Sequence, residues 1–185
     1  MRVIAGEFRS RKLKSVPGLE VRPTPDRLRE ALFNVLAPRI GGAVFLDCYA
    51  GSGSVGIEAL SRGAKRSIFI ERSARAIAIL RENLRSLGVE EQASVVRGSA
   101  ASLVSEYPAD IVFLDPPYDS EKEYSAALDA LAATRCGLAI AQHASGFHLE
   151  DVYGSLTRTR VLRQGDNSLS FFEPLESGAQ GAAEV

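Results

Sequence analysis

The stretch FLDCYAGSGSVGIEA, Phe45 to Ala59, joins an apolar run and an acid to three glycines and a helical pattern. The glycines, Gly51, Gly53 and Gly56, have the spacing G-x-G-x-x-G, which is typical of a loop that holds a dinucleotide. Glycines after a first strand let a ligand approach the backbone closely. A tight strand-to-helix turn without a ligand would use the same residues, so the spacing alone leaves the ligand open.

Two acids narrow the choice of ligand. Glu71 ends the next apolar run, 20 residues after Gly51, where an acid bonds ribose hydroxyls of either NAD or S-adenosylmethionine. Asp47 precedes the glycines, where its carboxylate would repel a pyrophosphate and suit the cationic amino group and sulfonium of S-adenosylmethionine. The structural alternative for Asp47 is a bond to the backbone at the start of the following helix.

The composition is that of an ordinary globular protein with an uneven charge distribution. The 185 residues are 45% hydrophobic and 24% charged, which fits one domain. Residues 1–39 carry a net charge of +5 and residues 40–185 a net charge of -6. This asymmetry predicts a basic arm for a polyanion, although a solvated basic surface without a partner explains it equally well.

Neither the cysteines nor the apolar runs indicate secretion or a membrane. We expect Cys48 and Cys136 to be small buried residues in strands, as in a protein of the reducing cytoplasm. The N-terminus lacks the apolar core of a signal peptide, and no apolar run reaches about 18 residues. We therefore expect a cytoplasmic protein.

From residue 44 onward, strand and helix patterns alternate. Strands are expected at 44–48, 67–71, 93–98, 109–115 and 137–143, with helices within 53–64, 72–88 and 120–133. This alternation predicts a Rossmann-like α/β fold with helices on both faces of a mostly parallel sheet. Residues 155–164 and 168–174 predict an antiparallel hairpin with its turn at 165–167, which completes a seven-stranded sheet.

The two ends of the chain differ from this central part. Residues 1–40 predict a basic extension, with a hairpin near the N-terminus and a helix capped by Thr24 or Asp26. Residues 41–175 form the expected ligand-binding domain. Residues 176–185 are small and polar, and we expect this tail to be disordered.

A second stretch, DIVFLDPPYDS, places Asp115, Pro116, Pro117 and Tyr118 after the fourth expected strand. Two prolines fix a rigid turn and remove two N–H donors, so nearby carbonyls can act as acceptors. An amine on an aromatic ring offers two N–H donors and a flat face. Asp115 and a proline carbonyl could accept those donors while Tyr118 stacks on the ring. The alternative is a turn with a buried aromatic lid.

These stretches resemble known motifs. LDCYAGSGSVGIEA resembles motif I of class I S-adenosylmethionine-dependent methyltransferases, and DPPY resembles motif IV of those that methylate exocyclic amino nitrogens. With RVIAG, RPTPDRLREALFNVL and GDNSLSFF, the chain from Arg2 to Phe172 is similar to the RsmD family. Those enzymes modify guanine N2 in 16S ribosomal RNA, so the resemblance implies this activity and a class I methyltransferase fold.

The resemblance also implies site residues. The methyl-transfer site would comprise Asp115 to Tyr118. The cofactor site would comprise Asp47, Tyr49, Gly51, Ser52, Gly53, Glu71, Arg72, Gly98, Ser99, Ala100 and Thr24. Ser99 departs from the pattern, because many such enzymes have an acid there for the adenine amino group.

The basic residues of the first segment are the candidates for RNA binding. They are Arg9, Arg11, Lys12, Lys14, Arg22 and Arg29. His143 and His148 lack partners at ligand spacing, so we expect no metal site. We expect a monomer whose partner is 16S rRNA or an assembling small subunit.

Three other functions remain as alternatives. A DNA adenine or cytosine N-methyltransferase would carry the same DPPY tetrad, but we see no segment large enough for a DNA target-recognition domain. An NAD-dependent oxidoreductase would conflict with Asp47 and with the terminal hairpin. A non-catalytic RNA-binding protein would not need both the tetrad and the glycine loop intact.

Overall fold

The computed structural model describes residues 1–16, 26–116 and 121–175. The helices are α1 (Asp26–Ile40), α2 (Ser54–Ser61), α3 (Ala74–Leu87), α4 (Ala100–Leu103) and α5 (Glu121–Ala132). The strands are β1 (Val44–Cys48), β2 (Arg66–Glu71), β3 (Ala93–Arg97), β4 (Ile111–Leu114), β5 (Leu138–Ala144), β6 (Val152–Tyr153), β7 (Leu156–Gln164) and β8 (Asn167–Pro174).

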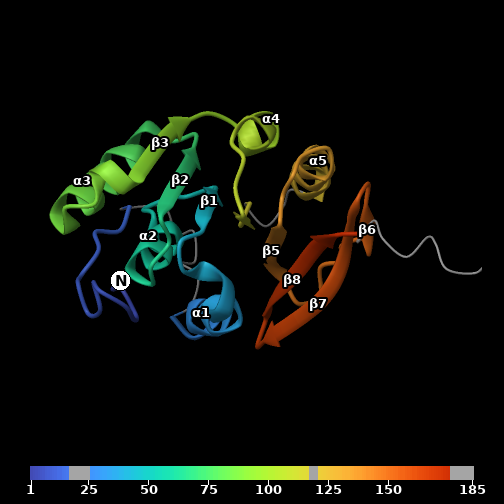
Figure 1. The fold of residues 1–185 in the computed structure, drawn as a ribbon, viewed down its shortest axis with the longest axis horizontal. Coiled ribbons are helices and arrows are strands. Elements are labelled where there is room, and N and C mark those ends of the chain that lie inside the picture. The colour runs from blue at the N-terminus through green and yellow to red at the C-terminus, as the bar shows by residue number, and fades with distance from the viewer. Residues whose placement is uncertain (17–25, 117–120, 176–185) are drawn as a thin grey trace, which may run out of the picture.

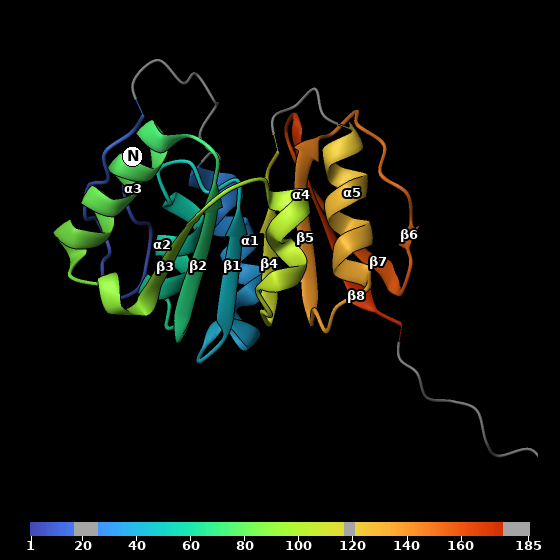
Figure 2. The same cartoon turned by 90° about the horizontal axis from the view of Figure 1, so that it is seen from above.

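The described strands form one sheet in the order β3-β2-β1-β4-β5-β8-β7-β6 (Figure 1). The pairs from β3 to β5 are parallel, and the pairs from β5 to β6 are antiparallel. In Figure 2 the parallel strands lie side by side with β1 and β4 at the centre. The order reverses between β1 and β4, which is the point where such sheets bind ligands.

Helices cover both faces of the sheet. Along β1, Phe45 packs with α1 on one face, and Leu46 packs with α5 on the other. Strands buried on both faces read as continuous apolar runs, which explains the composition of β1 and β4. Helix α1 presents Leu28, Leu32 and Leu36 to this core at the spacing of helical turns.

The predicted alternation of strands and helices is confirmed, with two corrections. The sheet has eight strands within the described residues, not seven, because the two-residue strand β6 pairs with the start of β7. Cys48 lies in β1 as predicted, but Cys136 precedes β5, so its placement in a strand is wrong; both thiols are buried and free. The hairpin turns at Gly165 and Asp166, and Asn167 already pairs with Gln164.

The N-terminal arm, which we define as residues 1–16, is less regular than predicted. A single antiparallel bridge joins Arg2 and Lys12, so the arm is a folded loop and not a hairpin of two regular strands. Its apolar residues Val3, Phe8 and Leu13 pack against α2 and α3. The predicted cap Thr24 and the tail 176–185 lie outside the described residues. The boundary predicted at residue 40 stays a prediction.

Candidate functional site

The carboxyl ends of four parallel strands bring the predicted cofactor residues together. The glycine loop follows β1, Glu71 ends β2, Gly98 to Ala100 follow β3, and Asp115 follows β4. Because neighbouring parallel strands end at the same edge of a sheet, segments far apart in the sequence meet at this switch point. The described part of the predicted site is therefore one cluster.

The glycine loop crosses over the end of β2. The N–H groups of Tyr49 and Ala50 both donate to the Ile70 carbonyl, each at 3.0 Å. Tyr49 has φ 71°, a conformation that non-glycine residues rarely adopt and that is common at functional sites. Burial raises the pKa of the Tyr49 phenol, and the nearby Glu123 carboxylate adds to this shift. The turn is thus strained where the predicted site begins.

Two glycines of the loop are required by close packing. Gly53 has φ 85°, and a Cβ there would lie 2.2 Å from the Leu80 side chain. A Cβ on Gly56 would lie 2.3 Å from the Phe69 ring, so α2 can approach β2 only without a side chain at this position. Gly51 has φ 55° and open space where a Cβ would stand. The spacing therefore serves both the turn and access to the backbone.

Asp47 is buried beneath this loop and is only 2% exposed. The Gly56 N–H donates to its Oδ2 at 2.9 Å, which confirms the backbone-bonding alternative at the start of α2. Burial raises the pKa of Asp47 to about 7, with the Gly56 N–H opposing the shift and the Asp115 and Glu71 carboxylates adding to it. Asp47 therefore lies within reach of the field of both other acids, and its predicted contact with a cofactor stays a prediction.

Glu71 organises the edge of the site. Its two oxygens accept from the N–H groups of Gly51 and Ser73, each at 2.8 Å. A carboxylate oxygen has a second lone pair, so both oxygens can still accept ligand hydroxyls. The side chain that was predicted to bind a ribose thus also fixes the position of the glycine loop.

The segment after β3 is anchored next to Glu71. The Gly98 N–H donates to the Glu71 carbonyl at 3.1 Å. Ser99 precedes α4, and its hydroxyl makes no capping bond to that helix. Ala100 is buried in the core. Within the described residues the Ser99 hydroxyl is therefore available to a ligand, and its predicted contact with the cofactor stays a prediction.

Of the remaining predicted site residues, the structure describes Arg72 but not four others. Arg72 forms an ion pair with Glu123 of α5 at 3.5 Å, beside Tyr49. Glu123 was not predicted, because its partners are distant in sequence. The remaining predicted residues lie outside the described residues: Pro117, Tyr118, Thr24 and Arg22.

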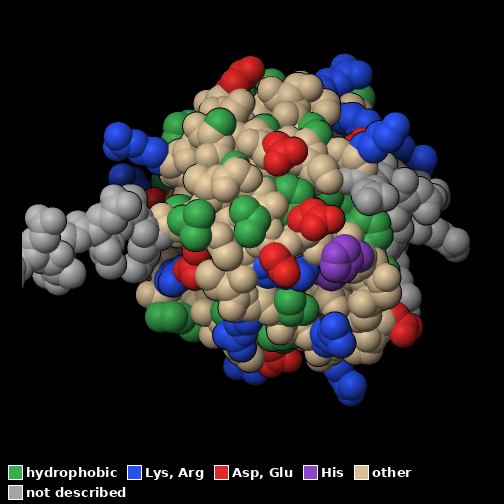
Figure 3. Space-filling model, turned by 90° about the vertical axis from the view of Figure 1, so that its right-hand side faces the viewer, with side chains coloured by type: hydrophobic (Ala, Val, Ile, Leu, Met, Phe, Trp, Pro, Cys, Tyr) green, Lys and Arg blue, Asp and Glu red, His purple; other side chains and the backbone are tan. Residues whose placement is uncertain are grey.

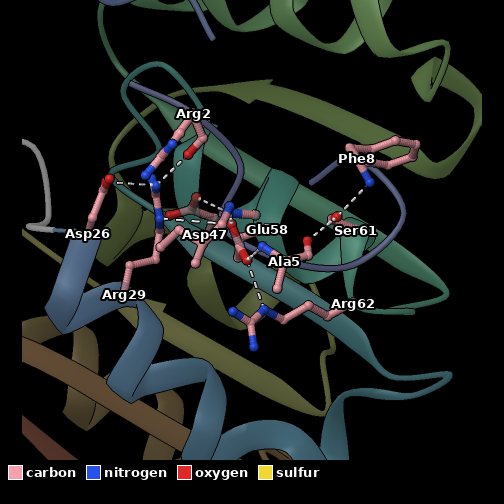
Figure 4. A network of polar contacts seen from close by, with 11 residues as sticks. Arg2, Ala5, Phe8, Asp26, Arg29, Asp47, Glu58, Ser61 and Arg62 are labelled. Atoms are coloured by element: carbon pink, nitrogen blue, oxygen red, sulfur yellow. Dashed lines mark hydrogen bonds and ion pairs between the residues drawn. The ribbon is translucent and has the colours of Figure 1, made fainter. Parts of the chain in front are cut away.

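The N-terminal arm is attached to α2 by buried polar side chains (Figure 4). The carboxylate of Glu58, which is fully buried, accepts from the N–H groups of Ile4 and Ala5 at 2.8 and 3.0 Å. Ser61 Oγ donates to the Ala5 carbonyl at 2.6 Å and accepts from the Phe8 N–H at 3.0 Å. Sequence analysis missed both side chains, although an acid inside the apolar helix α2 was a usable signal.

Asn83 of α3 connects the arm to the glycine loop. Its side-chain amide donates to the carbonyls of Ser52 and Lys14 at 2.9 and 3.0 Å, and its Oδ1 accepts from the Lys14 N–H at 2.8 Å. Asn83 is 1% exposed, so these bonds are shielded from water. The predicted RNA arm and the predicted cofactor loop thus share one support.

Arg29 corrects the sequence-based assignment. Its side chain is fully buried, and its Nη2 donates to the Arg2 carbonyl at 2.6 Å and to Asp26 at 3.1 Å. Burial lowers the pKa of Arg29, and the Glu58 and Asp26 carboxylates oppose this shift. An RNA contact through Arg29 is therefore wrong, because no part of the side chain reaches the surface.

The other described candidates for RNA binding are exposed. They are Arg9, Arg11, Lys12 and Lys14. Arg11 Nη2 donates to the Ser86 carbonyl at 2.7 Å, and Lys14 Nζ pairs with Glu82 at 2.8 Å. These cations belong to an arm that is fixed on α3.

Two negative findings concern the described residues only. None of the helices in ranges 26–116 and 121–175 is long and apolar enough to cross a membrane. The same search of the described chain finds no cluster of three His, Cys, Asp or Glu side chains that could hold a metal ion.

The sheet order, the glycine loop and the acid at the end of β2 are those of the class I methyltransferase fold. A solved structure from Escherichia coli, yhhF, superposes with a TM-score of 0.80 at 34% identity and covers 94% of this chain and 97% of that chain. Residues 1–173 match the family described as Conserved hypothetical protein 95, which is the RsmD family. The chain belongs to this family.

Two relatives add to the comparison. The Bacillus subtilis protein YlbH is 36% identical over 182 residues, which are 94% of this chain and 98% of YlbH. The Escherichia coli protein named ribosomal RNA small subunit methyltransferase D is 45% identical over 120 residues. That alignment spans 64% of this chain and 60% of the Escherichia coli protein.

Proposed function

We propose that the protein transfers a methyl group from S-adenosylmethionine to the exocyclic N2 of a guanine in 16S rRNA. The observation that carries this proposal is the gathering of Asp47, Glu71 and Asp115 around a glycine loop at the switch point. The relative named small subunit methyltransferase D supports the substrate class. The family resemblance supports guanine N2 as the acceptor.

The charge of the site favours this cofactor over NAD. Asp115 and Glu71 are close enough to raise the pKa of Asp47, so three carboxyl groups share one field. Such a field attracts an amino group and a sulfonium and repels a pyrophosphate. When bound, S-adenosylmethionine supplies an electrophilic methyl group on a positively charged sulfur. Glu71 keeps free lone pairs for its ribose, and the glycine loop leaves room for its amino-acid end.

Asp115 and Pro116 have the roles nearest to the chemistry. The Asp115 carboxylate and the Pro116 carbonyl would accept the two N–H groups of the guanine amine and orient its lone pair. The nitrogen then forms a bond to the methyl carbon as the carbon–sulfur bond breaks, which yields N2-methylguanine and S-adenosylhomocysteine. The proton lost from the nitrogen passes to solvent. Positioning accounts for much of the rate in this scheme, since no strong base is required.

A labelling experiment tests the proposal. The protein and methyl-labelled S-adenosylmethionine are incubated in parallel reactions, each with one substrate: unmodified 16S rRNA, unmodified small subunits or unmethylated DNA. Nucleoside mass spectrometry should find label in N2-methylguanine from rRNA or subunits. Label in a DNA adenine or cytosine would establish the alternative enzyme instead. Absence of label from every substrate, with cofactor binding intact, would refute the enzymatic proposal.

A pair of variants tests the role of Asp115. Asp115→Ala should lower kcat by about 100-fold or more, because positioning of the amine is lost, while cofactor binding stays within a few-fold. Asp129→Ala is the matched control, since Asp129 is an exposed acid on α5. Wild-type turnover by Asp115→Ala would refute the assignment.

We also propose a cytoplasmic monomer that needs no metal ion. Ribosomal subunits assemble in the cytoplasm, which places the enzyme with its substrate. Sedimentation equilibrium should give the mass of one chain, and activity should survive a chelator. A dimer, or loss of activity that zinc or magnesium restores, would contradict this part.

A further inference from the structure

Helix α3 has one buried face and one basic face. Its buried residues include Ala76, Leu80 and Leu84. The exposed residues include three arginines, of which the second and third are one helical turn apart. They are Arg75, Arg81 and Arg85, with Arg97 at the end of the adjacent strand β3. None of these four was a candidate in the sequence analysis, because they lie outside the basic first segment.

These arginines belong to the group in the described chain that no acid neutralises, which also includes Arg160 and Arg163 of β7. Elsewhere, several arginines are neutralised by an acid: Arg29 with Asp26, Arg39 with Glu173, Arg62 with Glu58, Arg72 with Glu123, and Arg158 with Asp151. Within the described residues, the four arginines of α3 and β3 form no ion pair. Their charge is available to a partner.

Two of these arginines line one open pocket. It has a volume of about 220 Å³ and is lined by Ala74, Ile77, Ala78, Arg81 and Arg97. Its small apolar floor can take the flat or apolar side of a sugar or base, and the guanidinium groups can donate to a phosphate in the fork geometry that arginine favours. This combination is typical of a nucleic-acid backbone contact.

The arm extends the same surface. Arg11 is bonded to the Ser86 carbonyl, and Lys14 is paired with Glu82, so both residues lie on the helix that carries the arginines. The charge of Lys14 is neutralised by Glu82, so Arg11 is the cation that the arm adds at this helix. The buried side chain of Asn83 bonds the N–H and the carbonyl of Lys14 and so fixes this part of the arm to α3. Arm and helix therefore present their cations as one rigid set and not as two independent parts.

We propose that the exposed face of α3, together with Arg97 and the arm, is a composite surface that binds rRNA phosphates flanking the target base. This proposal rests on the proposed function, since it names the substrate contacts of the same enzyme. The first turn of α3 follows directly from β2, whose end forms the edge of the site. An RNA strand that enters the site would thus continue along α3 toward the arm.

The opposite end of the sheet offers a control. The face over β6 and β7 carries basic and acidic side chains side by side (Figure 3). Arg160 and Arg163 are exposed residues of β7. A substitution of this pair changes the net charge as much as a substitution of Arg81 and Arg97, but at the far end of the sheet.

The experiment compares Arg81→Gln/Arg97→Gln with Arg160→Gln/Arg163→Gln. Binding to in vitro transcribed 16S rRNA is measured over a salt series, together with KM, kcat and cofactor affinity. Each lost phosphate contact should reduce the slope of log K against log salt by about 0.7–0.9, so the first variant should lose about 1.4–1.8. It should also raise KM for rRNA while kcat and cofactor affinity stay near wild type.

The control pair should keep the wild-type slope. Equal slopes for wild type and both variants, with methylation intact, would overturn the composite surface and leave the proposed function standing. Equal losses in both variants would also overturn it, because they would show a non-specific charge effect. Failure of the wild type to methylate any rRNA would instead refute the proposed function, and the salt slopes would still report on the surface.

Discussion

The N-terminal arm and the C-terminal hairpin both extend the sheet domain, but they are held in different ways. The hairpin strand β8 pairs along its length with β5 and β7 through backbone bonds. The arm makes one bridge within itself and is attached to the body largely through Glu58, Ser61 and Asn83. Backbone ladders depend little on side-chain identity, whereas the polar attachment of the arm rests mainly on these three side chains, beside the packing of its apolar residues on α2 and α3.

This difference predicts where single substitutions matter. Polar groups that lose a buried partner carry the full cost of desolvation. The arm side of the molecule should therefore be sensitive to changes of one side chain, and the hairpin side should tolerate them. One of the supports of the arm, Asn83, also bonds the glycine loop through the Ser52 carbonyl, so its loss should reach the cofactor site.

The largest effect is expected for Glu58→Ala. It removes the acceptor of the Ile4 and Ala5 N–H groups and leaves the buried Arg29 and its neighbour Arg62 without their shared carboxylate. Loss of one partner of a buried ion pair costs about 3–5 kcal/mol. The free energy of unfolding from denaturant titration measures this effect. A loss under about 1 kcal/mol would show that the arm is held by other contacts.

The slope of stability against pH should have opposite signs for a buried acid in one region and a buried histidine in the other. Asp47 lies under the arm side, and its pKa in the folded protein is raised from 3.8 to about 7. Between these values the folded protein binds a proton that the unfolded chain has released, so this contribution to stability is lost as pH rises from about 4 to about 7. The free energy of unfolding is measured by denaturant titration at each pH. The difference in this free energy between wild type and Asp47→Asn should change across the window by at most about 4 kcal/mol.

His143 of β5 pairs with β8, and the pH dependence of its contribution to stability should have the opposite sign. Its Nε2 faces Ser170 Oγ at 2.9 Å, and burial lowers its pKa. When a histidine is kept neutral in the folded state, the protein loses stability as pH falls, because the unfolded chain takes up the proton first. The free energy of unfolding of the wild type, relative to that of His143→Asn, should therefore decrease toward acid pH. Slopes of the same sign for both sites would contradict the assigned environments.

A smaller effect is expected for Asn83→Ala. The change leaves the Lys14 N–H and the carbonyls of Lys14 and Ser52 without their buried partner, at a cost of about 1–3 kcal/mol. Because Ser52 belongs to the glycine loop, cofactor affinity measured by calorimetry should also fall. Ser86→Ala on the same helix is the control, since Ser86 Oγ bonds only within α3. Equal cofactor affinity in both variants would show that the loop does not rely on Asn83.

The sequence was sufficient for the alternation of strands and helices because that pattern is local. Apolar runs such as 44–48 and 67–71 identify strands, and the stripe from Ala76 to Leu87 identifies α3. Strand β6 was missed because two residues carry no periodicity. The location of the candidate site followed from the same reasoning, since strand ends are recognisable in sequence.

The attachment of the arm could not be predicted in this way. Glu58 meets Ile4 across 54 positions of sequence, and no local pattern relates them. Arg29 shows the same limit, because in sequence it continues a basic segment, while in the structure an acid from α2 accompanies it into the core. The charge of a segment is readable from sequence, but the side chains that will be buried depend on which helix packs against it.

The smallest effect is expected on the hairpin side, for Glu173→Gln. Glu173 of β8 pairs with Arg39 at the end of α1, and both side chains are accessible to water, at 29% and 53% exposure. Such pairs contribute about 0–1 kcal/mol, because solvent screens them. The loss should shrink further in high salt, whereas the loss in Glu58→Ala should not. A cost for Glu173→Gln as large as that for Glu58→Ala would remove the distinction between the two ends, since it would place an essential side-chain anchor in the hairpin as well.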